Sequence, residues 1–136
     1  MTDINEKSMI PENEKKEGKE RSAELARLAI TALEDKKAED VRVIDIGDVS
    51  VLADYFIIAN GNNRNQVQAM ADSVEEELAK AGFEPKQIEG YQTANWILLD
   101  YRDIIIHVFS KDDRAFYDLE RIWRDGKEIS RADLEA

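Results

Sequence analysis

The 136-residue sequence contains no cysteine, and this absence excludes several kinds of chemistry at once. Without thiols the chain can form neither disulfide bonds nor thiolate zinc sites, and it has no cysteine nucleophile. Histidine is nearly as scarce, because His107 is the only one in the sequence. Zinc sites usually combine several histidine or cysteine ligands, so we expect no metal centre of that kind. A triad built on His107 would also need an acyl-transfer signature such as Gly-x-Ser-x-Gly, which the sequence lacks.

Long uncharged hydrophobic runs are also missing from the sequence. We therefore expect no signal peptide, no membrane-spanning helix and a location in the cytoplasm. Basic residues are fewer than acidic ones, so the formal net charge is −11. An acidic chain repels phosphate backbones, so direct sequence-specific binding to nucleic acid is not expected. Its charge instead favours association with basic proteins.

Composition divides the chain into three parts. Residues 1–20 are mostly polar and carry few apolar side chains, which predicts a disordered tail. Residues 21–125 predict a single folded domain, and a domain of that size buries roughly 60–70% of its surface on folding. Residues 126–136 are again polar, and we expect them to form a frayed end.

The periodicity of apolar residues in the domain predicts alternating helices and strands. Ser22 is suited to cap a first helix, whose buried stripe would include Leu25, Ala29 and Leu33. Asn63 and Gln66 fit the capping box of a second helix that ends near Gly82. A third helix is expected at roughly Arg114–Trp123. The predicted strands are Val41–Ile46, Asp54–Ala59, Pro85–Ile88, Trp96–Leu99 and Ile104–Phe109. The element order is therefore αββαβββα, which predicts an α/β fold of the α+β kind with a mixed sheet of about five strands.

The central pair of predicted strands, Trp96–Leu99 and Ile104–Phe109, is apolar on both faces. Side chains alternate along a strand, so Trp96, Leu98 and Asp100 share one face while Ile97 and Leu99 share the other. Helices of the same chain are expected to cover one of these faces, and a partner could cover part of the second. A face that holds Trp96, Leu98 and Asp100, flanked by Tyr101 and Asp103, suits a protein interface with a basic partner. A role in the core for Trp96 is the alternative.

Three further features could carry chemistry, and each has a plain structural alternative. The loop at Gly61 precedes a helix N-terminus and could hold an anion, or it could be only a capped turn. His107 could be a ligand or a buried imidazole with ordinary hydrogen-bond partners. The acidic residues Asp45, Asp48 and Asp54 could bind a metal ion, or they could be solvated turn residues.

Several motifs, in the same order and spacing, resemble the iojap family of ribosomal silencing factors between Leu25 and Trp123. Asn63 departs from the pattern, since the family usually has serine there. The motifs that match are Asp54-Tyr55-Phe56-Ile57-Ile58-Ala59-x-Gly61, Gln66-Val67-x-Ala69, Trp96-Ile97-Leu98-Leu99-Asp100-Tyr101 followed by Asp103, His107-Val108-Phe109, and Arg114-x-Phe116-Tyr117-x-Leu119-Glu120-x-x-Trp123.

The resemblance implies a translation factor that is not an enzyme and needs no cofactor. Such factors bind the large ribosomal subunit through the protein numbered fourteen in its L series, and they block joining of the small subunit. The implied fold is nucleotidyltransferase-like, without the acidic pair that holds metal in transferases, and the sequence indeed has no Asp-x-Asp. Members are often homodimers. The alternatives are a nucleotide-binding protein that uses the Gly61 loop and a homodimeric scaffold with no ribosomal role.

Overall fold

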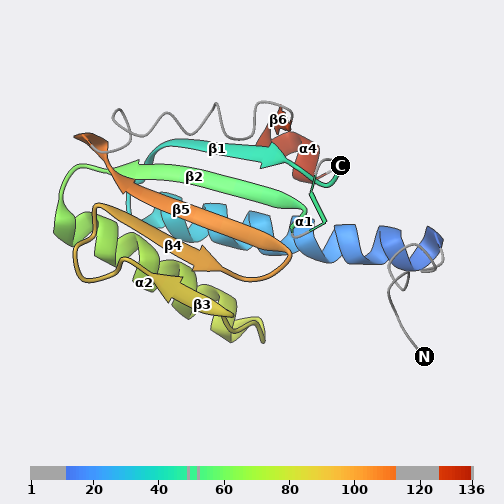
Figure 1. Ribbon diagram of the computed structural model, residues 1–136, viewed down its shortest axis with the longest axis horizontal. Coiled ribbons are helices and arrows are strands. Elements are labelled where there is room, and N and C mark those ends of the chain that lie inside the picture. Colours follow the sequence, from blue (N-terminus) through green and yellow to red (C-terminus); the bar gives the residue numbers. More distant parts are fainter. Residues whose placement is uncertain (1–11, 49, 52, 113–125, 136) are drawn as a thin grey trace.

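The computed structural model describes residues 12–48, 50–51, 53–112 and 126–135 of the chain (Figure 1). Within these ranges, six strands form one mixed sheet in the order β3-β4-β5-β2-β1-β6. β2 and β5 run parallel to each other, and every other pair of neighbours is antiparallel. The strands are β1 (Glu39–Asp45), β2 (Tyr55–Gly61), β3 (Gln87–Glu89), β4 (Trp96–Asp100), β5 (Ile104–Ser110) and β6 (Lys127–Ile129). The α+β class with a mixed sheet is therefore confirmed, with six strands instead of about five.

Two long helices, α1 (Glu12–Asp35) and α2 (Arg64–Lys80), cover one face of this sheet and contact each other, as Figure 1 shows. The Ser73 hydroxyl of α2 donates a hydrogen bond of 3.0 Å to the carbonyl of Ala32 in α1, which joins the two helices inside the core. Neither helix has the length and hydropathy that a membrane crossing would need, and the same holds for every helix in the described ranges.

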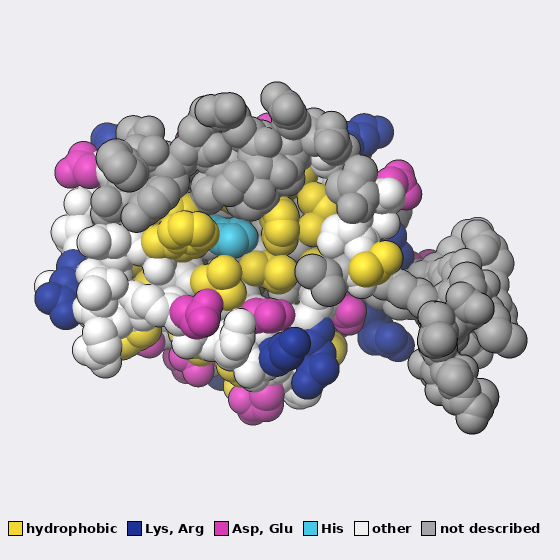
Figure 2. Space-filling model, in the orientation of Figure 1, with side chains coloured by type: hydrophobic (Ala, Val, Ile, Leu, Met, Phe, Trp, Pro, Cys, Tyr) yellow, Lys and Arg dark blue, Asp and Glu magenta, His cyan; other side chains and the backbone are white. Residues whose placement is uncertain are grey.

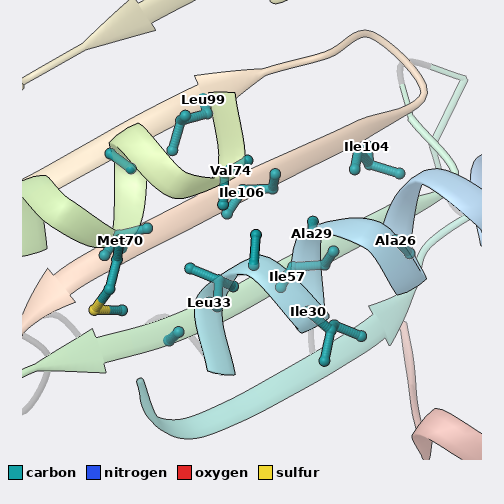
Figure 3. Close-up of a cluster of buried hydrophobic side chains, with 14 of the residues drawn as sticks. Ala26, Ala29, Ile30, Leu33, Ile57, Met70, Val74, Leu99, Ile104 and Ile106 are labelled. Carbon is teal, nitrogen blue, oxygen red and sulfur yellow. The ribbon is translucent and has the colours of Figure 1, made fainter. Parts of the chain in front are cut away.

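The main core lies between these helices and the sheet. Figure 3 shows side chains of α1 and α2 pointing at those of β2, β4 and β5. Ile57 and Ile106 are fully buried there, beneath Leu33 of α1 and Val74 of α2. The burial of these apolar side chains away from water is the main force that holds the helices against the sheet. The predicted apolar stripes of both helices therefore meet the sheet as expected.

The start of α1 differs from the sequence prediction. The helix begins at Glu12, within the segment predicted to be a disordered tail, so Ser22 lies inside the helix and is not its N-cap. Ser22 is fully buried, and its hydroxyl donates to the carbonyl of Gly18 and to Asp54. Lys19 contacts Asp45 through its ammonium group at 2.9 Å. The stretch of α1 before Ser22 has no apolar stripe, and these polar contacts with the β1–β2 segment hold it instead.

The C-terminal end also differs from the prediction. Residues 127–135 are not frayed, because β6 pairs with β1 and the short helix α4 (Arg131–Glu135) packs on α1. Leu134 is buried in the main core, and the carbonyl of the same residue accepts a hydrogen bond from Arg27. Arg131 donates to the Thr31 hydroxyl at 2.8 Å. The predicted helix at Arg114–Trp123 lies outside the described residues. The other predicted elements are present, with shifts of a few residues at their ends except at the start of α1, which lies at Glu12 and not near Ser22 as predicted.

Candidate partner-binding face

The sheet face turned away from α1 and α2, which we call the second face, carries its own apolar cluster. Across the strands, Leu98 lies opposite His107, and His107 lies beside Ile58 of β2. In the next row Asp100 lies opposite Ile105, which is beside Phe56. Figure 2 shows hydrophobic side chains gathered around the single histidine, with acidic side chains below them. The cluster is Ile44, Ile46, Ala53, Phe56, Ile58, Trp96, Ile105 and Phe109.

Trp96 and Leu98 remain partly exposed on this face, whereas Ile97 and Leu99, which alternate with them along the strand, are buried against the helices. The burial of β4 thus alternates as the sequence predicted. Ile105 and Phe56 are also partly exposed. A face that combines a partly exposed tryptophan with three partly exposed apolar side chains has the composition that protein interfaces favour at their centre. The choice of Trp96 and Leu98 as partner-binding residues stays a prediction.

The indole of Trp96 is held in place by two neighbours on β5. Its Nε1 donates a hydrogen bond of 3.0 Å to Nδ1 of His107. Its ring stacks on Phe109 with centroids 5.1 Å apart and planes 29° apart. The rings of His107 and Phe56 lie in turn nearly perpendicular to each other, with centroids 5.3 Å apart and planes 84° apart. His107 is therefore a structural partner of Trp96, as the plain alternative in the sequence analysis proposed.

The burial of His107 makes the stability of the fold depend on pH. Burial disfavours the imidazolium form and lowers the pKa of His107 from 6.5 to about 4. The unfolded chain binds more protons between these values, so stability is complete above pH 6.5 and is lost as the pH falls towards 4. We expect this effect of His107 alone to lower the free energy of unfolding by about 3 kcal/mol over this pH range. Urea unfolding at several pH values measures this loss of stability, which His107→Asn should lack. Equal pH profiles for the wild type and this variant would contradict the expectation.

Two acidic residues, Asp100 and Asp103, lie at the turn between β4 and β5. The Asp100 carboxylate accepts a hydrogen bond of 2.8 Å from the backbone N–H of Arg102, which adopts a φ of +72°. Asp103 is exposed in the same turn, and its carbonyl accepts from the N–H of Asp54 at 2.7 Å. The turn is thereby fixed to the start of β2. Asp100 lies opposite Ile105, so its negative charge is next to the apolar cluster, and the choice of Asp100 and Asp103 as partner-binding residues stays a prediction.

Tyr101 does not lie on the second face, which corrects its predicted position. Its side chain is 5% exposed and belongs to the main core on the helix side. Its hydroxyl is buried and has no hydrogen-bond partner among the described residues, and this burial raises the pKa of the phenol. The strand ends at Asp100, so the alternation that places Trp96 and Leu98 no longer fixes the side of the next residue.

Removing the Tyr101 hydroxyl, which has no hydrogen-bond partner among the described residues, should have a measurable effect on stability. Removing a buried polar group that has no partner relieves a desolvation cost. We therefore expect Tyr101→Phe to leave the free energy of unfolding unchanged or to raise it by about 1 kcal/mol. The matched control is Tyr91→Phe, which removes an exposed hydroxyl that donates to Asp72 at 3.1 Å and should lower stability slightly. Urea unfolding measures both; a clear loss of stability in Tyr101→Phe would contradict the assignment.

The loop before β4 is held by α2 and determines where β4 begins, at Trp96. The Gln68 side chain donates to the carbonyl of Tyr91 at 2.9 Å, and Arg64 donates to the carbonyl of Gln92. At the end of the loop, the carbonyl of Asn95 accepts from the N–H of Ser110. Sequence reasoning gave this loop no role. Its part in positioning Trp96 follows from contacts between segments far apart in the chain, which no local pattern shows.

The Gly61 loop has the geometry of a capped turn. Asn63 is the N-cap of α2, and its side chain accepts from the N–H of Gln66 at 2.9 Å, which confirms the predicted cap. The side-chain amide oxygen (Oε1) of Gln66 accepts from the backbone N–H of Asn62. A side chain at Gly61 would meet Met70 and Val67 at 3.1 and 3.2 Å, so close packing of β2 on α2 explains the glycine. Two of the amides that could hold an anion, those of Asn62 and Gln66, are thus engaged within the chain.

The acidic residues between β1 and β2 are engaged with α1. Asp45 pairs with Lys19, and it also accepts from the N–H of Gly47 at 3.0 Å. Asp54 accepts from the Ser22 hydroxyl at 2.6 Å, while Asp48 is exposed. In the described part of the chain, no group of three or more acidic or histidine side chains is arranged to hold a metal ion. These contacts give Asp45 and Asp54 a structural role in holding α1.

Comparisons with known proteins relate this arrangement to one family. The family model described as "Ribosomal silencing factor during starvation" matches residues 19–136. A ribosomal silencing factor of Halalkalibacterium halodurans is 43% identical over 78% of this chain and 91% of its own length. The corresponding Bacillus subtilis protein is 41% identical over 74% of this chain and 86% of its own. A crystal structure from Bacillus halodurans, 41% identical, superposes with a TM-score of 0.72 over 79% of this chain and 97% of that one. The chain belongs to the ribosomal silencing factor family.

Proposed function

We propose that this protein binds the large ribosomal subunit through the protein numbered fourteen in its L series. Bound there, it blocks association with the small subunit and so represses translation. Membership of the ribosomal silencing factor family supports a ribosomal partner and a role in regulating translation. The more specific partner and the block of subunit joining are what the family resemblance implies for this chain.

One structural observation carries the proposal: the second face presents a fixed, partly exposed tryptophan at one end of β4 and the carboxylate of Asp100 at the other end. Trp96 and Leu98 supply the apolar centre, and Asp100 and Asp103 supply negative charge at its border. Desolvated aromatic side chains at an interface centre hold a complex together, whereas charges at its rim speed encounter with a partner of opposite sign. A basic ribosomal protein fits both features of this face. Tyr101 is left out of the proposed surface because it is buried in the core.

The mechanism is steric and requires no reaction. A protein that occupies the surface where two particles meet prevents their association in proportion to its occupancy. We propose accordingly that the chain is not an enzyme. The rival function, nucleotide binding at the Gly61 loop, gains no support from the geometry, because Gln66 and Asn63 already engage that turn.

Light scattering during subunit joining tests the proposed function. Large subunits preincubated with excess protein should join small subunits to a reduced extent, and adding more protein should deepen the inhibition until it saturates. Protein carrying Trp96→Ala serves as the matched control and should inhibit much less. Unimpaired joining at saturating protein would overturn the proposed function.

Reversing the charge of Asp100 should slow association with the isolated ribosomal protein. Asp100→Lys is expected to lower the association rate by about threefold to tenfold at low salt and to flatten its salt dependence, because steering charge is lost. Stopped-flow mixing measures the rates. Glu76→Lys makes the same charge change on the exposed side of α2 and should have a smaller effect. Asp100→Asn, which keeps an oxygen for the Arg102 N–H, should fall between; equal rates for the two lysine variants would contradict the prediction.

A further inference from the structure

The contact between His107 and Trp96 joins a buried polar residue to the proposed binding surface. His107 is 4% exposed, so a partner on the second face would hardly touch it. Its Nδ1 nevertheless accepts the hydrogen bond from the indole of Trp96, which is partly exposed. The two residues come from adjacent strands and are diagonal neighbours on one face, because Trp96 is opposite Phe109 and His107 is opposite Leu98, two residues farther along each strand.

The chemistry of this bond restricts both side chains. An indole N–H can only donate, so Trp96 needs an acceptor wherever its nitrogen is removed from water. An imidazole nitrogen accepts only when it carries no proton, so His107 bears its proton on Nε2 in this geometry. Together with the stack on Phe109, the bond defines both the tilt of the indole and the direction in which its nitrogen points.

We propose that His107 is a positioning residue that holds the indole of Trp96 in the orientation in which a partner binds it. The inference rests on the proposed function of the second face and adds the residue that pre-organises it. A tryptophan that is already fixed before binding loses less conformational freedom on association, and the complex is correspondingly tighter. His107 acts through Trp96 and makes no contact of its own with the ribosomal protein.

A double-mutant cycle on the isolated ribosomal protein tests the coupling. In the presence of Trp96, His107→Phe should weaken binding about tenfold, because the indole N–H loses its acceptor and its fixed direction. In the Trp96→Phe background, where no N–H is present, the same change should weaken binding by less than about twofold. Equal losses in the two backgrounds, or no loss in either, would overturn the positioning role.

Two further variants keep the test decisive if His107→Phe disturbs folding. His107→Asn places an amide oxygen near the position of Nδ1, and its affinity should stay within about threefold of the wild type. His107→Gln carries its amide farther out, towards the position of Nε2, and should resemble His107→Phe. Equal affinities for the Asn and Gln variants, with both folded by circular dichroism, would overturn the proposal.

A measurement without any partner separates this inference from the proposed function. In nuclear magnetic resonance spectra of the free protein, the indole N–H signal that Trp96→Phe removes belongs to Trp96. This proton should exchange slowly with solvent in the wild type and in His107→Asn, and faster in His107→Phe and His107→Gln. Exchange that is the same in all four proteins would overturn the role of His107. Failure of the wild type to bind the ribosomal protein would instead overturn the proposed function.

Discussion

Replacing Trp96 by alanine is expected to weaken binding to the isolated ribosomal protein by more than about 1 kcal/mol, which is roughly fivefold in affinity. Trp96 is the largest partly exposed side chain of β4 on the second face, and Phe109 and His107 hold it in place. An aromatic side chain fixed in this way buries a large area on binding at small entropic cost. Isothermal titration of the wild type and the variant measures the difference.

Two controls make the result for Trp96→Ala specific. Trp96→Phe keeps a ring beside Phe109 but lacks the N–H, so its affinity should lie between those of the wild type and the alanine variant. Phe83 is also partly buried, but it packs against the main core on the helix side. Phe83→Ala should therefore lower stability and leave affinity nearly unchanged. Unchanged affinity in a folded Trp96→Ala would show that this residue is not an interface residue.

The second large effect is expected at Gly90, in the loop that leads into β4. Gly90 has a φ of +81°, and a Cβ at this position would lie 2.2 Å from the backbone carbonyl oxygen of Trp96. Neither atom belongs to a flexible side chain, so the loop and the start of β4 would have to move apart. We expect Gly90→Ala to lower the free energy of unfolding by about 3 kcal/mol or more. Urea unfolding measures this change.

Gly82 is the matched control for Gly90. It has a φ of +93°, but a Cβ there would meet no atom within 4 Å. Gly82→Ala should therefore cost only the strain of a left-handed backbone, about 1 kcal/mol. The difference between the two variants isolates the close approach to Trp96. Similar losses of stability in both would contradict the view that this contact sets the position of β4.

Elements with a strong local signal were predicted well from the sequence. The alternation of β4 places Trp96 and Leu98 on one face and Ile97 on the other, as the period of two requires. The helix α2 begins after Asn63, as the capping pattern predicted, and Gly82 follows its end with a positive φ. In each case residues close together in the sequence determine the structure, so a local pattern is sufficient.

Elements held by distant contacts were predicted poorly. The helix α1 extends through a polar segment because Lys19 and Ser22 bind Asp45 and Asp54 of the β1–β2 segment. The strand β6 contains only Lys127, Glu128 and Ile129, a composition with no strand signal of its own. It forms because β1 offers an edge with which it can pair. Tertiary contacts here override local propensity.

The candidate site was predicted in part. The sequence placed Trp96, Leu98 and Asp100 together because one strand carries all three, and it placed Tyr101 wrongly because the strand has ended there. Phe56 and Ile105 complete the second face, and they could not be assigned to it without the parallel pairing of β2 with β5. The bond from Trp96 to His107 likewise depends on the register between β4 and β5.

Sedimentation with purified large ribosomal subunits tests most directly whether this acidic domain acts by occupying the large subunit. The wild type should pellet with large subunits at low and moderate salt and should not pellet with small subunits, while Trp96→Ala should stay largely in the supernatant. Wild-type protein that remains in the supernatant with large subunits at both salt concentrations would contradict the account.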